Sequence, residues 1–105
     1  MIVEPHHANA LTAAELERLV LLADQMAQSI HAISKILRHG YESRHPLMPQ
    51  GPTNRDWLEK ELAHVQVAAR LMFDAGDIRR SACDAHDQDK SEELHRYLHH
   101  QHTLR

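Results

Sequence analysis

The sequence has few of the residues that build sheets, tight turns or disulfide-stabilised folds. It contains three glycines, four prolines, one cysteine, one tryptophan, two tyrosines and one phenylalanine in 105 residues. Strands are enriched in aromatic residues, so this shortage argues against a sheet. A lone Cys83 cannot form an internal disulfide, which fits a reducing compartment. Alanine, leucine, glutamate, glutamine, arginine and histidine dominate instead, and this composition predicts an all-α fold.

Long apolar runs and concentrated positive charge are missing as well. No apolar segment approaches the ~20 residues that cross a membrane, and residues 1–10 lack the basic and apolar regions of a signal peptide. The formal net charge is -3, with both signs spread along the chain, whereas nucleic-acid-binding proteins carry basic patches. We therefore expect a cytoplasmic protein that binds neither a membrane nor a nucleic-acid polymer. The 11 histidines are most simply a titratable surface.

Apolar periodicity predicts a long first helix over residues 13–39. It follows a capping box formed by Thr12 and Glu15 and ends before Gly40, a residue suited to a helix C-terminus. Residues 40–53 then form a loop, because three prolines and Gly51 exclude regular structure there. A loop of this length more often has a functional or interfacial role than a purely connecting one.

Two further helices are predicted after the loop. The second begins at a cap provided by Thr53 or Asn54 and ends within residues 74–77, and a third, more polar helix covers about 78–98. We interpret residues 1–11 as a flexible arm, 12–101 as a single domain and 102–105 as a tail. A domain this short buries a modest share of its surface, so we expect oligomerisation to complete it.

A polar cluster is predicted between the first two helices. Gln25 and Gln28 interrupt an apolar row on the first helix, and Glu61 and His64 interrupt one on the second. Residues three apart share a helix face, so antiparallel packing would bring all four side chains together. Burying such a group is costly unless its members find partners. The cluster is either a polar network between helices or oligomer subunits, or a ligand or metal site of the kind that helical bundles build.

The sequence resembles the MazG-like nucleoside triphosphate pyrophosphohydrolases, in particular the short phage and bacterial members. The resemblance lies in Ala32–Gly40, in Thr53–Arg55 with Leu58–Val65, and around Lys90 and Arg96–Gln101, and it covers about residues 16–101. The resemblance implies a MazG-like helical bundle. It also implies cleavage of a nucleoside triphosphate to monophosphate and pyrophosphate, with Mg²⁺ (or Mn²⁺) held by Glu-x-x-Glu on one helix and Glu-x-x-Asp on the next.

The metal motif of the family is degenerate here. The first motif reads Gln25-Met26-Ala27-Gln28 and the second reads Glu61-Leu62-Ala63-His64, so only Glu61 is unchanged. Mg²⁺ prefers anionic oxygen ligands, and the substitutions should abolish tight binding unless substrate phosphates or the neighbouring Asp24 compensate. A Glu-x-x-His pair could instead suit a transition metal.

The resemblance and the sequence pattern indicate further candidate binding residues. Lys35 and Arg38 share a face beyond the cluster and could neutralise phosphate charge, or could stabilise the helix C-terminus. Asn54, at the start of the second helix, could contact phosphate or, as we prefer, act as a cap. Lys90 resembles a phosphate-contacting lysine or is simply solvated. Trp57 is a core or interface residue or stacks on a base.

A separate set of histidines could bind metal weakly at the end of the chain. It consists of His95, His99 and His102.

Three functions remain after these observations. The chain is expected to bind a nucleotide on a MazG-like fold with catalysis weak or lost. Alternatively it is an active pyrophosphohydrolase with a remodelled metal site, in which Glu61 is the one remaining ligand or base, or it is a structural helical subunit. The predicted partners are a nucleotide and further copies of the chain, as a homodimer or homotetramer.

Overall fold

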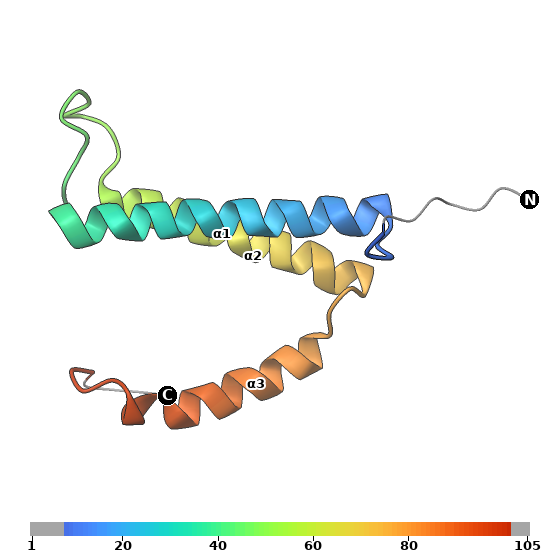
Figure 1. The fold of residues 1–105 in the computed structure, drawn as a ribbon. Coiled ribbons are helices and arrows are strands. Elements are labelled where there is room, and N and C mark those ends of the chain that lie inside the picture. Colours follow the sequence, from blue (N-terminus) through green and yellow to red (C-terminus); the bar gives the residue numbers. More distant parts are fainter. Residues whose placement is uncertain (1–7, 102–105) are drawn as a thin grey trace, which may run out of the picture. The chain divides into compact units, whose positions relative to one another are not determined.

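The computed structural model describes residues 8–101, and all of its regular secondary structure is helical. The helices are α1 (Ala13–His39), α2 (Asn54–Ala75) and α3 (Arg80–Glu93), followed by the short 3₁₀ helix η1 (Leu94–Arg96) (Figure 1). Extended pairing within the described residues is limited to one isolated bridge between Arg44 and Thr53. The all-α prediction is confirmed. Parts of the predicted arm and tail, residues 1–7 and 102–105, lie outside the described residues.

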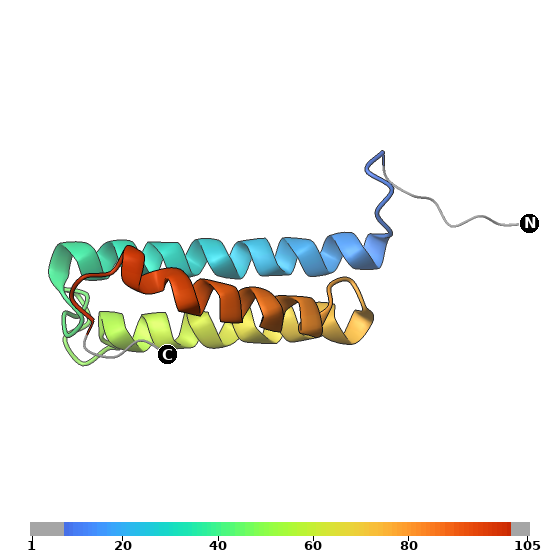
Figure 2. The same ribbon diagram turned by 90° about the horizontal axis from the view of Figure 1, so that it is seen from below.

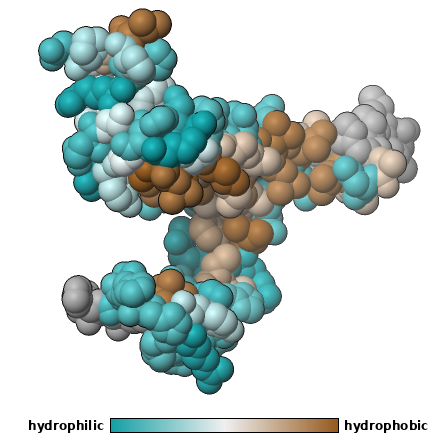
Figure 3. Space-filling model, turned by 60° about the vertical axis from the view of Figure 1, so that its left-hand side comes forward, coloured by the Kyte–Doolittle hydropathy of each residue, from teal (hydrophilic) through white to brown (hydrophobic). Residues whose placement is uncertain are grey.

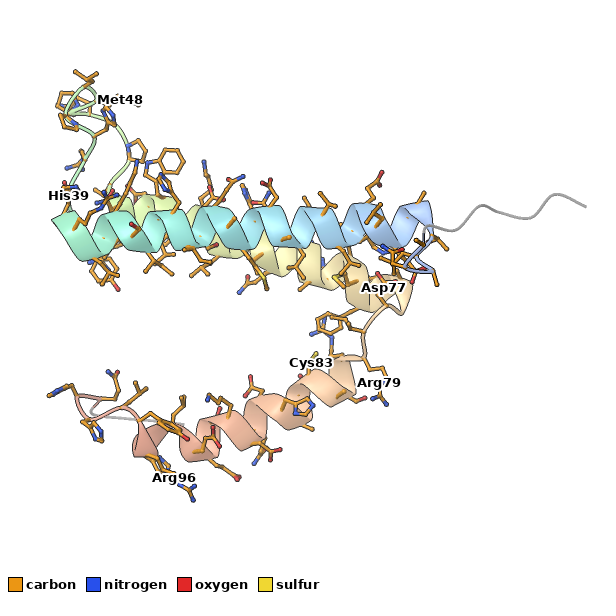
Figure 4. The ribbon with its side chains drawn as sticks, viewed as in Figure 1. His39, Met48, Asp77, Arg79, Cys83 and Arg96 are labelled. Atoms are coloured by element: carbon orange, nitrogen blue, oxygen red, sulfur yellow. The ribbon has the colours of Figure 1, made fainter. Side chains whose placement is uncertain are left out.

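The chain divides into two compact units, residues 1–72 and 73–105. In the first unit, α1 and α2 run antiparallel and are joined by a loop at one end, as both ribbon views show (Figures 1 and 2). In Figure 4, His39 lies where α1 ends and Met48 lies in the outer part of the loop. None of the helices within residues 8–101 is long and apolar enough to cross a membrane.

The predicted bounds of α1 are confirmed by its two caps. The backbone N–H of Glu15 donates to Thr12 Oγ1 over 3.1 Å, and the N–H of Thr12 donates to Glu15 Oε1 over 3.0 Å. This reciprocal pair satisfies two amides that the helix itself leaves free. At the other end, Gly40 has φ +86° and its N–H donates to Ile36 O over 2.7 Å. Glycine reaches this backbone conformation without the steric cost that a side chain adds.

Thr53, rather than Asn54, caps α2. The N–H of Asp56 donates to Thr53 Oγ1 over 3.1 Å, and the N–H of Thr53 donates to Asp56 Oδ2 over 2.8 Å. The preferred role of Asn54 as a cap is therefore wrong. Its side-chain Nδ2 donates to Gly40 O over 3.0 Å, so this buried amide ties the start of α2 to the end of α1.

Most of the buried side chains between α1 and α2 are small. Among the described residues the buried apolar side chains are Ala32 on α1 and Ala68 and Met72 on α2. Ser29 is also buried, and its hydroxyl donates to Gln25 O over 3.0 Å. Small residues let two helices approach closely but remove little apolar surface from water. Much apolar surface therefore stays on the outside of the hairpin, where Figure 3 shows it in brown.

The second unit contains the more polar helix, which is shorter than predicted. α3 begins at Arg80 instead of residue 78 and ends at Glu93, and η1 follows it. Gly76, with φ +80°, breaks the chain direction before α3, and Arg79 is extended. The exposed Cys83 lies on α3 (Figure 4). Polar pairs three or four residues apart support the helix, including the 3.1 Å contact between Lys90 Nζ and Glu93 Oε1.

Candidate functional site

The four residues of the predicted polar cluster lie together between α1 and α2. Gln25 Oε1 lies 3.2 Å from His64 Nδ1, across the two helices. His64 Nδ1 also lies 3.7 Å from Glu61 Oε2, and Gln28 and Glu61 line one cavity. The antiparallel register predicted from the i, i+3 spacing is therefore the register that the structure has.

Each of the two glutamines has a side-chain hydrogen-bond partner. Gln28 Nε2 donates to Asp24 Oδ2 over 3.2 Å, and Gln25 Oε1 is placed to accept from His64 Nδ1 when that nitrogen carries hydrogen. Asp24 thus lies beside the cluster, but it faces Gln28 from an exposed position and does not line the cavity. Both glutamine side chains therefore use part of their hydrogen-bonding capacity in contacts with other side chains.

Glu61 is the one deeply buried acid in the cluster. The residue is 2% exposed, and its Oε2 makes no hydrogen bond to any of the described residues. Lys60 Nζ lies 3.7 Å from Glu61 Oε1 and 4.1 Å from the centre of the Trp57 ring. A buried carboxylate oxygen without a hydrogen-bond donor is destabilising, so this side chain lowers the folding stability of the hairpin.

The donor set does not fit Mg²⁺. That ion requires near-octahedral oxygen coordination and gives up its water reluctantly. The cluster offers a single buried carboxylate. Its two amides and its imidazole carry no negative charge and already contact other side chains. Within residues 8–101, no group of three or more His, Cys, Asp or Glu side chains is arranged to hold a metal ion.

Two cavities adjoin along the first unit. The first, which we call the inter-helix cavity, has a volume of about 320 Å³. The second, the loop cavity, has a volume of about 360 Å³. Both are of the size that small ligands occupy. Lys35 and Trp57 line both cavities, so together they form the wall between them. The inter-helix cavity is further lined by Ala27, Gln28, His31, Ala32 and Glu61.

The loop cavity is strongly basic. Its cationic and titratable lining residues are Lys35, Arg38, His39, Arg44 and His45, and no Asp or Glu lines it. Lys35 Nζ makes no ion pair or hydrogen bond to the described residues. Arg44 Nε donates to Gly51 O over 3.0 Å, and Arg38 Nε donates to Ser34 O over 3.4 Å. Each guanidinium is thus oriented by a backbone carbonyl and keeps its remaining N–H groups for an anion.

Comparisons with models of protein families, with curated proteins and with solved structures found no match. The case for function therefore depends on the residues and geometry of the first unit together with the motif resemblance.

The remaining candidate residues fall into two groups. Asn54 lines the loop cavity, but its amide nitrogen is engaged with Gly40 O. Trp57 is 40% exposed and lines both cavities, so it is not a core residue. Lys90 belongs to the second unit, where it pairs with Glu93. In the predicted histidine set, His95 and His99 are exposed residues of the second unit, and His102 lies outside the described residues.

Sequence reasoning missed several residues of the two cavities. His31 precedes the Lys35 of the same helix face by four residues, so helical spacing alone could have placed it beside Gln28 and Lys35. Arg44 and His45 had no such signal. They reach the loop cavity through the path of the loop, which the bridge between Arg44 and Thr53 and the bond from Asn54 N–H to Ser43 O fix in place.

Proposed function

We propose that this chain is a MazG-like helical protein that binds a nucleoside triphosphate or a related nucleotide without a metal ion, with catalysis weak or lost. The observation that carries the proposal is the shared wall formed by Lys35 and Trp57. A lysine that makes no ion pair with the described residues and an exposed aromatic ring both line a basic cavity and a less polar one. A nucleotide needs both features, because its phosphates require positive charge and its base requires an aromatic or apolar surface.

The loop cavity is where we place the phosphates. Lys35, Arg38 and Arg44 supply three positive charges without a lining carboxylate. Arginine offers forked hydrogen bonds to phosphate oxygens, and lysine acts as a point charge. Such binding needs no metal to neutralise the ligand.

The changes in the acidic motif favour metal-free binding. A carboxylate about 4 Å from a phosphate charge repels it by roughly 4 kcal/mol at an effective dielectric near 20. Residues 25, 28 and 64 carry amides and an imidazole where the family has acids. The repulsion that Mg²⁺ otherwise offsets is therefore largely removed, and so is the set of ligands that would hold the ion for hydrolysis.

Trp57 is where we place the nucleotide base. Stacking of a base on an aromatic side chain contributes about 1–3 kcal/mol. Lys60 lies over the ring at 4.1 Å from its centre. Stacking therefore uses another part of the exposed indole or displaces this lysine.

The chain contains a single tryptophan, which makes its fluorescence a direct probe of the site. Titration with the four common nucleoside triphosphates and their deoxy forms, in EDTA and then in Mg²⁺, should change Trp57 emission equally in both conditions. Lys35→Gln should weaken binding by roughly tenfold to a hundredfold, the loss expected for one charge-assisted contact. Arg70→Gln makes the same charge change at an exposed residue outside both cavities and should leave the affinity unchanged.

The same samples distinguish the other two functions. Release of pyrophosphate that disappears in Glu61→Gln would identify an active pyrophosphohydrolase. A protein that neither turns over nor responds to millimolar nucleotide, by fluorescence or by melting temperature, would be a structural subunit, and the binding proposal would be wrong.

We also infer that self-association, as a homodimer or homotetramer, completes the bundle. The support is the small buried core of the hairpin, set against the many large apolar side chains that its two helices expose. Sedimentation or light scattering at micromolar concentration tests this.

A further inference from the structure

The inter-helix cavity contains a buried carboxylate whose hydrogen-bonding capacity is unused. Glu61 lines this cavity, and its Oε2 accepts no hydrogen bond from the described residues. Lys60 Nζ lies 3.7 Å from Oε1 and His64 Nδ1 lies 3.7 Å from Oε2, and both distances are too long for a hydrogen bond. A buried polar group without a partner calls for a physical explanation, and a ligand that donates N–H groups into the cavity supplies one.

Trp57 lies one helical turn before this carboxylate and lines the same cavity. Four residues of an α-helix span about 6 Å along its axis, which is close to the width of a nucleobase. A base stacked on the indole would therefore present its edge to Glu61. On the facing helix the cavity is lined in part by Ala27 and Ala32, whose small side chains leave room for a flat ring.

Access to the carboxylate requires only side-chain movement. Glu61 Oε2 is closed to water, so a ligand reaches it after neighbouring side chains shift. Lys60 and His64, which flank the carboxylate, have side chains that are 51% and 48% exposed, and exposed side chains change rotamer within nanoseconds. The last torsion of a glutamate side chain is also soft. The carboxylate can therefore turn toward a ligand without any displacement of the helices.

The chemistry of a carboxylate selects among the nucleobases. An ionised carboxylate accepts hydrogen bonds and donates none. Guanine is the common base whose pairing edge carries two neighbouring donors, the ring N1–H and the 2-amino group. Adenine and cytosine place an amino group beside a ring nitrogen that carries a lone pair, and uracil and thymine place their N–H between two carbonyl oxygens. Guanine therefore matches both carboxylate oxygens in a paired, charge-assisted contact, whereas each of the other bases turns a lone pair toward one of them.

We propose that the inter-helix cavity binds the base of a guanine nucleotide, with Glu61 accepting hydrogen bonds from N1–H and the 2-amino group while the ring stacks on Trp57. This assignment rests on the proposed nucleotide-binding function and adds the base that the site selects. The phosphates then lie beyond Lys35, in the loop cavity that this residue also lines. Glu61 thereby has a role that needs no metal ion, and its cost to stability is of the kind that binding sites often carry.

Calorimetric titration of the full chain with GTP, ITP and ATP, in EDTA, tests the selection of the base. ITP differs from GTP only by lacking the 2-amino group. GTP should bind roughly tenfold to a hundredfold more tightly than ITP, which is the range for one hydrogen bond to a charged group, and should exceed ATP by at least as much. Inorganic triphosphate, titrated in parallel, reports on the phosphate contacts without a base.

Glu61→Gln should change which base the site prefers. Glutamine presents one acceptor and one donor, which complement the amino group and the ring nitrogen of adenine. The ratio of GTP affinity to ATP affinity should therefore fall by roughly tenfold or more, with the affinity for inorganic triphosphate unchanged. A purely structural effect would weaken both nucleotides alike and leave the ratio as it was. Glu59→Gln makes the same charge change at an exposed residue that lines neither cavity, and it should keep the parent's ratio.

Three results would overturn the assignment. Equal affinities for GTP and ITP would show that nothing in the site accepts from the 2-amino group. A guanine preference that survives in Glu61→Gln would show that another residue reads the base. In both cases, binding of inorganic triphosphate would leave the proposed nucleotide-binding function standing. A parent protein that binds neither the nucleotides nor inorganic triphosphate would overturn the assignment and that function together.

Discussion

Gln25 Oε1 and His64 Nδ1 lie 3.2 Å apart although the two residues are 39 positions apart in the chain. The MazG-like resemblance places acidic side chains at both positions. Two acids at this distance would repel each other without a cation between them, whereas an amide and an imidazole can share a hydrogen bond. The hairpin therefore closes over this point without needing a metal ion.

Introducing acids at the three positions where the resemblance expects them should create a need for metal. The variant Gln25→Glu, Gln28→Glu, His64→Asp would place three carboxylates next to Glu61. In EDTA it should melt at a lower temperature than the parent, because like charges at short range oppose folding. Mg²⁺ should raise its melting temperature in a concentration-dependent way and should leave the parent unchanged, as scanning calorimetry can measure.

The control for this variant adds the same charge elsewhere. Gln50→Glu, Gln66→Glu and Gln101→Glu, made together, add three carboxylates at exposed positions, and they should produce little Mg²⁺ response. A triple variant that is as stable in EDTA as in Mg²⁺ would show that the four side chains are not close enough to act together.

Removing the charge of Glu61 should stabilise the protein. Its Oε2 is buried without a hydrogen bond; Lys60 Nζ lies 3.7 Å from Oε1, and His64 Nδ1 lies 3.7 Å from Oε2. Glu61→Gln keeps the shape and removes a buried charge whose Oε2 has no hydrogen-bond donor, so the free energy of unfolding should rise by about 1–3 kcal/mol. Urea denaturation measures this. Glu59→Gln, at an exposed position of the same helix, should change it little, and a less stable Glu61→Gln would mean that the carboxylate has a partner that it needs.

Sequence reasoning placed the elements of the first unit well because their signals are local. Thr12 and Glu15 define one end of α1 and Gly40 the other, and the i, i+3 spacing of the polar pairs predicted which side chains meet. The errors arose where the outcome depends on competing contacts. Asn54 and Thr53 are both good caps, and the contact of the Asn54 side chain with Gly40 O, 14 residues away, cannot be predicted from the local sequence.

The second unit and the loop were harder to predict from the sequence than the two long helices, for a physical reason. α3 has few apolar residues, so its ends follow from turns and charge pairs rather than from a periodic stripe. Arg44 enters the loop cavity through the fold of a segment rich in proline, where no periodicity exists to read.

Acid should weaken the cap of α2. The backbone N–H of Thr53, and then the hydroxyl of the same residue, hold the pKa of Asp56 below its ordinary value of 3.8. Because the pKa of Asp56 is lower in the folded chain than in the unfolded chain, its carboxylate stabilises the folded state at neutral pH. This contribution is lost as the pH falls below about 4. Asp56→Asn should therefore reduce the difference in melting temperature between pH 6 and pH 3. Asp74→Asn, near the other end of α2 and exposed, should leave that difference unchanged. Equal acid sensitivity of the parent and Asp56→Asn would contradict the contribution of the cap.

The bond from Asn54 to Gly40 should be essential to the first unit, because it joins the two helices where the loop leaves them. Asn54 is 7% exposed, and its Nδ2 donates to Gly40 O over 3.0 Å. Asn54→Asp keeps the size of the side chain but turns a donor into an acceptor that faces a carbonyl oxygen, so the free energy of unfolding should fall by about 1–3 kcal/mol.

The same change at Asn9 is the matched control, because exposed Asn9 accepts from Leu11 N–H through Oδ1 and an aspartate can do likewise. Since Asn54 also lines the loop cavity, Asn54→Asp should weaken nucleotide binding at Trp57 as well, whereas Asn9→Asp should not. An Asn54→Asp protein with the parent's stability would show that the end of α1 and the start of α2 are held together by other contacts.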